Sequence, residues 1–125
     1  MGRATKLPVV LLVEDEALIS NLIADVLNNS GFAVHELASG DAALAYLHAG
    51  GEVDVLFTDI NLPGAIDGVE LARQARQLRP ELPIIYTSGR CAYSDLGTVV
   101  PRSVFVAKPY SPPDVCTLIG RMTAN

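Results

Sequence analysis

The stretch Val9-Val10-Leu11-Leu12-Val13-Glu14-Asp15 places two acids directly after five apolar residues. A short, continuous apolar run of this kind is typical of a buried parallel strand. Three later runs have the same form, and the polar residues that follow them are Asp59 after 55–58, Ser88 after 84–87 and Lys108 after 104–107. Ligands of open α/β sheets bind outside the carboxyl ends of the strands. The pattern therefore predicts that three carboxylates, a hydroxyl and an ammonium group meet at one edge of one sheet.

Helical patterns alternate with these strands. Apolar residues recur between positions 18 and 27 at the spacing of one helix face, at Leu18, Ile19, Leu22, Ile23, Val26 and Leu27. The following Asn-Asn-Ser-Gly at 28–31 is typical of a helix C-terminus. Further helices are predicted for 39–49, 69–79 and 111–122, the last with Ser111 as N-cap and Pro112 at its first position. Residues 89–102, which include Gly89, Gly97 and Pro101, leave room for only a short or degenerate helix.

With a second strand at 32–37, the chain is predicted to be an α/β protein of the form (βα)5. Alternating strands and helices favour a parallel sheet with right-handed crossovers. Each strand is interpreted as apolar throughout, so helices are expected on both faces of the sheet. The domain is predicted to span 8–123, and residues 1–7 are expected to form a flexible N-terminal arm.

Composition restricts the class of protein. The chain has 125 residues, of which 50% are hydrophobic and 18% charged, and this favours one globular domain. The net charge of −5 argues against nucleic acid as a partner. Arg73, Arg76 and Arg79 have helical spacing and are interpreted as a solvated helix face or, alternatively, as a docking surface for a protein. No apolar stretch is long enough for a membrane span or a signal peptide, and two cysteines do not make a disulfide framework, so a cytoplasmic location is predicted.

The polar residues at the strand ends form a chemically distinctive set. Three carboxylates, Glu14, Asp15 and Asp59, raise one another's pKa unless a cation neutralises them. Oxygen ligands of this kind suit Mg²⁺, which is commonly bound beside a phosphate, and the absence of His and Cys from the set disfavours zinc. Lys108 supplies a positive charge, and Ser88 a hydrogen-bond donor, for phosphoryl oxygens. Asp59 begins a long loop and can act as a nucleophile that forms an acyl phosphate.

Four motifs carry these residues: Val13-Glu14-Asp15-Glu16, Asp59-Ile60-Asn61-Leu62-Pro63-Gly64, Thr87-Ser88-Gly89 and Lys108-Pro109-Tyr110. In this order they resemble the response regulator receiver domain of two-component signalling, over about 8–122. The resemblance implies a doubly wound, flavodoxin-like sheet with strand order 2-1-3-4-5. One departure is that the segment from Pro63 to Gly68 is one residue longer than the commonest pattern of the family.

The resemblance also implies roles for the residues that bind the phosphoryl group and the cation. Asp59 is the phosphoacceptor, and Lys108 contacts the phosphoryl group. Glu14, Asp15, Asp59 and the backbone carbonyl of Asn61 are the implied Mg²⁺ ligands.

Other implied roles concern switching and the lifetime of the phosphoryl group. Ser88 is the hydroxyl switch residue, and Phe105 falls on the aromatic switch position. Asn61 and Arg90 flank the site and control access of the attacking water, so Asn61→Met is expected to slow dephosphorylation. The Lys108–Pro109 peptide bond is expected to be cis.

The leading hypothesis is a phosphorylation-dependent signalling switch that accepts a phosphoryl group from a histidine kinase or phosphotransfer protein and acts on a downstream protein target. A homodimer is possible, and the chain is not expected to be an enzyme that turns over an external substrate. Met1 and the short arm favour a stand-alone receiver over a fragment of a hybrid kinase. One alternative is a pseudo-receiver that binds without phosphorylation. Another is an aspartyl-phosphate phosphohydrolase, which usually has a second acid where Asn61 stands and a cap domain over the substrate.

Overall fold

The computed structural model describes residues 6–89 and 100–124. Its strands are β1 (Val9–Val13), β2 (Ala33–Leu37), β3 (Val55–Asp59), β4 (Ile84–Ser88) and β5 (Ser103–Ala107). Its helices are α1 (Ala17–Asn29), α2 (Gly40–His48), α3 (Gly68–Leu78) and α4 (Pro112–Thr123). All strand pairs are parallel in the order β2-β1-β3-β4-β5, which confirms the predicted doubly wound sheet. Residues 90–99, which make up most of the segment where a short or degenerate helix was expected, lie outside the described residues.

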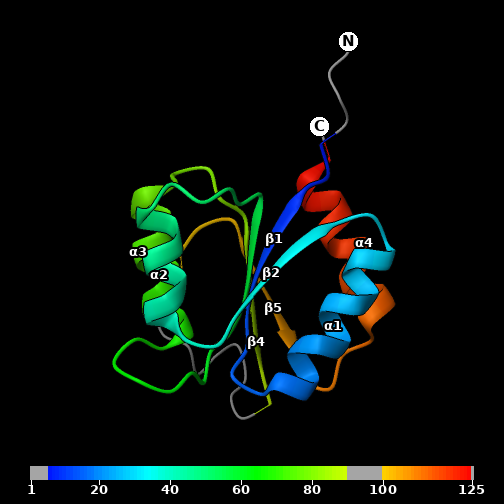
Figure 1. The fold of residues 1–125 in the computed structure, drawn as a ribbon, viewed down its shortest axis with the longest axis horizontal. Coiled ribbons are helices and arrows are strands. Elements are labelled where there is room, and N and C mark those ends of the chain that lie inside the picture. Colours follow the sequence, from blue (N-terminus) through cyan, green and yellow to red (C-terminus); the bar gives the residue numbers. More distant parts are fainter. Residues whose placement is uncertain (1–5, 90–99, 125) are drawn as a thin grey trace.

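The core has two layers, one on each face of the sheet. Helices α2 and α3 cover one face, and α1 and α4 cover the other (Figure 1). Alternate residues of each central strand point to opposite faces, so Leu56 packs under α2 and α3, whereas Phe57 packs under α1 and α4. The strands β1, β3 and β4 are buried along their whole length, as the apolar runs predicted.

The two edge strands differ from the expectation that every strand is apolar and buried throughout. In β2, His35 and Glu36 are exposed, and in β5, Val104 and Ala107 are exposed. An edge strand has one neighbour in place of two, and the flanking helices lie mainly over the centre of the sheet, so its outer residues stay in contact with solvent. The expectation was therefore correct only for the three central strands.

Only part of the apolar stripe of α1 is buried. Ile23 and Leu27 are buried, but Leu18 is 86% exposed and Leu22 is 59% exposed. The six apolar positions span a wider arc than the sheet and α4 can cover, so the outer two remain on the surface. Leu18 and Leu22 are thus not core residues.

Element boundaries follow from local hydrogen bonds. Gly31, with φ of +98°, follows the last turn of α1, and the Phe32 N–H donates to the Leu27 carbonyl at 3.1 Å. Because Phe32 closes this cap, β2 begins at Ala33, one residue later than predicted. Ser111 is the N-cap of α4, as expected, but its side chain makes no capping hydrogen bond.

Arg73 and Arg76 of α3, with Arg79 at its C-cap, do not form one solvated face. Arg73 pairs with Glu70, whereas the other two bind backbone carbonyls of neighbouring elements. The Arg79 guanidinium donates to Leu47 O at 3.1 Å and to Gly51 O at 2.9 Å, at the C-terminal end of α2. The interpretation as a solvated face is therefore correct only for Arg73.

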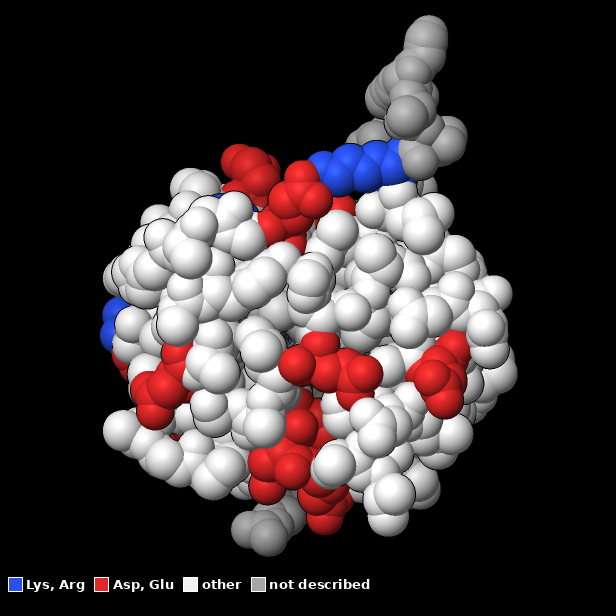
Figure 2. All heavy atoms as spheres, viewed as in Figure 1, with Lys and Arg blue, Asp and Glu red and all other residues white. Residues whose placement is uncertain are grey.

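Surface charge and the N-terminus can be followed in Figure 2, where acidic side chains are spread over the visible face. Lys6 forms an ion pair with Glu52, so the described end of the expected arm contacts the domain. Residues 1–5 of that arm lie outside the described part of the chain. Among the described residues, no helix is both long and apolar enough to cross a membrane.

Candidate functional site

The carboxyl edge of the sheet brings the polar residues of the four motifs together. Asp59 is the last residue of β3 and is paired with Thr87 of β4, and Ser88 is paired with Ala107, which directly precedes Lys108. Glu14 directly follows β1, and its N–H donates to Leu37 O at 3.0 Å. Backbone pairing therefore fixes the position of the Cα atom from which each of these side chains projects.

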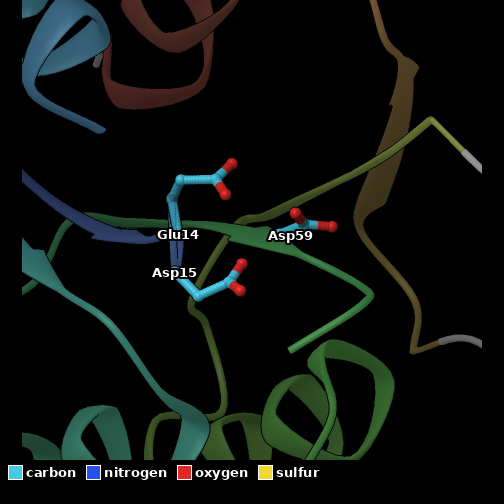
Figure 3. Close-up of side chains that lie close together, drawn as sticks. All are labelled: Glu14, Asp15 and Asp59. Atoms are coloured by element: carbon cyan, nitrogen blue, oxygen red, sulfur yellow. The ribbon is translucent and has the colours of Figure 1, made fainter. Parts of the chain in front are cut away.

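Three carboxylates form the centre of the site (Figure 3). Glu14, Asp15 and Asp59 each offer an oxygen, and these oxygens lie within 4.8 Å of one another. Glu14 is 4% exposed and Asp59 is 6% exposed, whereas Asp15 is open to solvent. So close a group of acids needs positive charge nearby to stay ionised.

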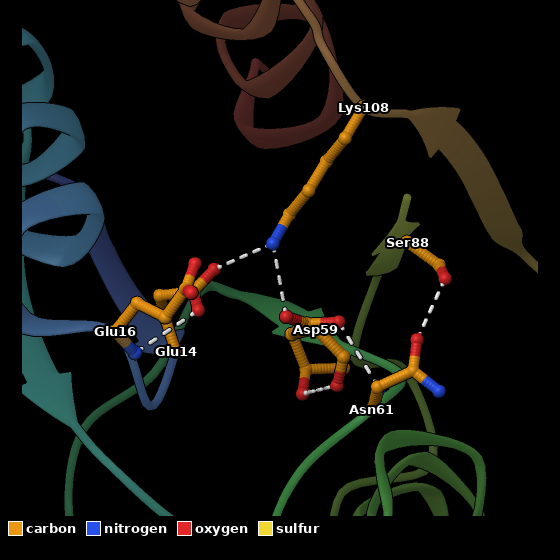
Figure 4. A network of polar contacts seen from close by, with 7 residues as sticks. Glu14, Glu16, Asp59, Asn61, Ser88 and Lys108 are labelled. Carbon is orange, nitrogen blue, oxygen red and sulfur yellow. Dashed lines mark hydrogen bonds and ion pairs between the residues drawn. The ribbon is translucent and has the colours of Figure 1, made fainter. Parts of the chain in front are cut away.

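Lys108 supplies part of that charge (Figure 4). Its Nζ donates to Glu14 Oε1 at 3.0 Å and to Asp59 Oδ2 at 3.0 Å. Burial alone would lower the pKa of Lys108, but the hydrogen bonds and charges of Asp59 and Glu14 outweigh burial and raise it above its usual value. Lys108 is therefore held as a cation between two buried acids.

The two acids after β1 differ in what they can still bind. Glu14 accepts from Lys108 through one oxygen and from the Glu16 N–H, at 3.2 Å, through the other. Burial raises the pKa of Glu14, and the hydrogen bonds from Lys108 and Glu16 only partly offset this effect. Asp15 is exposed and lines the adjoining pocket. Asp15 and Asp59 thus face the pocket, whereas Glu14 does not line it and binds the lysine.

Asn61 contacts both the acid at the end of β3 and the hydroxyl at the end of β4. Its N–H donates to Asp59 Oδ1 at 3.0 Å, and its side-chain Oδ1 accepts from Ser88 Oγ at 2.8 Å (Figure 4). The family resemblance implied roles for the backbone carbonyl of Asn61 and for its effect on water, but not the side-chain bond to Ser88. Spacing along the chain carries no signal for that bond, because it depends on how the loop after β3 folds back toward β4.

The loop after Asp59 is positioned by two glycines. The Gly68 N–H donates to Ile60 O at 2.9 Å, and a Cβ at Gly68 would collide with the Asp59 carbonyl oxygen. A Cβ at Gly40, the first residue of α2, would lie 2.7 Å from the Ile66 carbonyl oxygen. The lengthened loop is therefore packed closely against the start of both α2 and α3, and it keeps Asn61 next to the acids.

A pocket of about 280 Å³ opens at the acids and is lined by Asp15, Glu16, Asp59, Asn61, Gly89 and Lys108. This volume is several times the roughly 30 Å³ that one water molecule occupies in the liquid. It can accommodate a phosphoryl-sized group together with a hydrated cation.

The remaining expectations concern Phe105, Arg90 and the Lys108–Pro109 peptide bond. Phe105 is partly buried and packs against the core layer beneath α2 and α3. Arg90 lies outside the described residues, so the structure does not place it. The Lys108–Pro109 bond is cis, as the resemblance implied.

The donor set fits a hard divalent cation. Three carboxylates converge, and one lysine cannot balance three negative charges. All side-chain ligand candidates in this cluster are oxygen donors, which suits Mg²⁺. Of the three acids, Asp15 and Asp59 line the pocket and are placed to hold such an ion.

Comparison with known proteins agrees with this geometry. Residues 10–120 match the family model for the response regulator receiver domain. The chain belongs to that family. The domain is 38% identical over 113 residues to the transcriptional regulatory protein CreB of Escherichia coli, covering 88% of this chain and 48% of CreB. It is also 34% identical to the sensor kinase CckA of Brucella abortus, covering 90% of this chain and 12% of CckA.

A solved structure shows the same fold. A response regulator receiver protein from Sinorhizobium medicae superposes with a TM-score of 0.87 and 32% identity, covering 94% of this chain and 95% of that one. The chain spans about half the length of CreB and about an eighth of CckA. What these proteins share with this chain is thus the receiver domain of two-component signalling.

Proposed function

We propose that this receiver domain is a phosphorylation-dependent switch that accepts a phosphoryl group on Asp59. The observation that carries the proposal is the environment of the Asp59 carboxylate. Lys108 Nζ binds one of its oxygens, the Asn61 N–H binds the other, and both residues line the pocket. These donors orient the carboxylate at the pocket, as a nucleophile requires.

The reaction itself is a simple transfer. An Asp59 oxygen attacks the phosphorus, the bond from phosphorus to the donor atom breaks, and the donor keeps the bonding electron pair. The product is an acyl phosphate on Asp59. Lys108 stabilises negative charge on the phosphoryl oxygens. A Mg²⁺ ion held by Asp15, Asp59 and the Asn61 carbonyl would offset the charge of the carboxylates and of the incoming group.

The donor is proposed to be a histidine kinase or a histidine phosphotransfer protein, and the output a downstream protein target. Similarity to a sensor kinase and to a transcriptional regulator supports a place in a phosphorelay. In this proposal the domain catalyses its own phosphorylation and dephosphorylation and does not turn over an external substrate. Assembly as a homodimer is also left as a proposal.

Intact-mass measurement after incubation with acetyl phosphate and MgCl₂ tests the function. The wild type should gain the mass of one phosphoryl group, and EDTA should prevent the gain. Asp59→Asn should abolish it, whereas Asp25→Asn, an exposed acid of α1, should leave it unchanged. Undiminished labelling of Asp59→Asn would contradict the assignment of the phosphoacceptor.

A further inference from the structure

The hydrogen bond between Ser88 and Asn61 joins the expected switch hydroxyl to the loop that carries the phosphoacceptor. Ser88 is 1% exposed, and its backbone is fixed, since its carbonyl accepts from the Lys108 N–H at 3.0 Å. Asn61 is an exposed loop residue. The bond therefore links a buried, anchored donor to an acceptor on the surface.

The chemistry of the serine hydroxyl makes this bond a choice between two partners. A serine hydroxyl has a single proton to donate. While Ser88 donates it to Asn61 Oδ1, at 2.8 Å, the same proton cannot be donated to a phosphoryl oxygen on Asp59. The two hydrogen bonds are mutually exclusive, so forming one requires that the other breaks.

We propose that Asn61 is a positioning residue that holds the Ser88 hydroxyl in the unphosphorylated state and thereby sets how readily the switch engages. This inference rests on the proposed function. When the bond breaks, the Asn61 amide can turn to solvent, where water satisfies it. The buried Ser88 hydroxyl exchanges its amide acceptor for a phosphoryl oxygen, which is charged and forms the stronger bond.

Asn61 also senses the phosphoacceptor directly, because its N–H donates to Asp59 Oδ1 at 3.0 Å. Chemistry at Asp59 therefore changes the backbone position of the residue whose side chain holds Ser88. The acceptor and the switch hydroxyl are connected through one residue, over two hydrogen bonds.

Beryllium fluoride with MgCl₂, a mimic of the phosphoryl group on aspartate, tests the proposal by calorimetric titration. Asn61→Ala should bind it more tightly than wild type, by about two- to tenfold, because the bond of Ser88 to Asn61 no longer has to be broken. In the Ser88→Ala background, Asn61→Ala should have no such effect. Ser88→Thr keeps the hydroxyl and should restore the effect. Equal tightening in the Ser88→Ala background would overturn the proposal, since Asn61 would then act without Ser88.

Unfolding by urea in EDTA gives an independent readout without ligand. The effects of Asn61→Ala and Ser88→Ala on the unfolding midpoint should not add, because either substitution removes the same bond. Additive effects would overturn the proposed bond. If wild-type protein fails to bind the mimic, the proposed function itself is overturned. If wild type binds and both backgrounds respond alike, only the role of Asn61 is.

Discussion

A buried glutamate, Glu14, forms an ion pair with the partly buried Lys108 at the centre of this site. Glu14 donates no proton to its neighbours and uses both oxygens as acceptors, one toward Lys108 and one toward Glu16. The folded protein nevertheless holds a proton on Glu14 more tightly than the unfolded chain does, because burial raises its pKa. Ionisation of Glu14 therefore lowers the free energy of unfolding and is a cost to the folded state. The ionised carboxylate nevertheless holds Lys108 in place at the site.

The pH dependence of stability follows from this shift. Below the unfolded pKa of about 4.5 Glu14 is protonated in both states and the cost is absent. The cost grows as the pH rises from there through the raised pKa of the folded state. In EDTA, Glu14→Gln should therefore be more stable than wild type at pH 7, and the advantage should shrink toward pH 4. Urea unfolding across this range measures the difference in unfolding free energy between Glu14→Gln and wild type, with Glu16→Gln as the exposed control. A difference that grew on acidification would contradict a raised pKa of Glu14 in the folded state.

The lifetime of the phosphoryl group is a second property of single residues. Asn61 lines the pocket, and its short amide can hydrogen-bond a water without excluding it. Asn61→Met should slow dephosphorylation several-fold, measured by loss of the phosphorylated mass over time. Asn61→Ala is the matched control, because it also frees Ser88 but shields no space from water. A decay rate unaltered by Asn61→Met would rule out Asn61 as a control on water access, and faster decay in Arg90→Ala would point to Arg90 in its place.

At the scale of elements, the alternation of strands and helices was predictable because short continuous apolar runs alternate with segments whose apolar residues recur at helical spacing. The residues at which the elements begin and end were less predictable. β2 begins at Ala33 since Phe32 completes the cap of α1, and α1 leaves Leu18 and Leu22 exposed because its stripe is wider than the surface beneath it. Such outcomes depend on how neighbouring elements pack, and no single stretch of sequence contains that information.

The same holds for Arg79, whose spacing indicated a solvated position. Its guanidinium instead binds one carbonyl in the last turn of α2 and one just after that helix, and so joins α2 to the end of α3. Arg79→Met keeps the length of the side chain but removes both bonds, and it should lower the unfolding free energy by about 1–2 kcal/mol. Denaturant unfolding measures this, and Arg121→Met, an exposed arginine of α4, should change stability little. Equal effects of the two substitutions would mean that the carbonyl contacts contribute nothing.

At the scale of the whole molecule, the grouping of the site residues was easier to predict from the sequence than the exact ends of the elements. The acids, the hydroxyl and the lysine each directly end or follow a parallel strand, and parallel strands deliver their carboxyl ends to one edge. The order of strands in the sheet followed from the family resemblance. The Ser88–Asn61 bond could not be predicted, because it depends on the path of a loop whose length departs from the family's commonest pattern.

The sheet therefore holds a concentrated negative charge at one edge, and a cation should stabilise the entire fold. A ligand that binds only the native state stabilises it by mass action, by about 1.4 kcal/mol at a free concentration ten times its dissociation constant. Millimolar MgCl₂ should raise the melting temperature of wild type by several degrees. Asp15→Asn removes the most exposed acid of the cluster, so it should melt higher than wild type in EDTA and respond less to MgCl₂. Differential scanning calorimetry with Asp25→Asn as control distinguishes binding at a site from general charge screening. If Asp25→Asn lost its Mg²⁺ response as fully as Asp15→Asn, the stabilisation would come from overall charge and not from a site at the carboxyl edge.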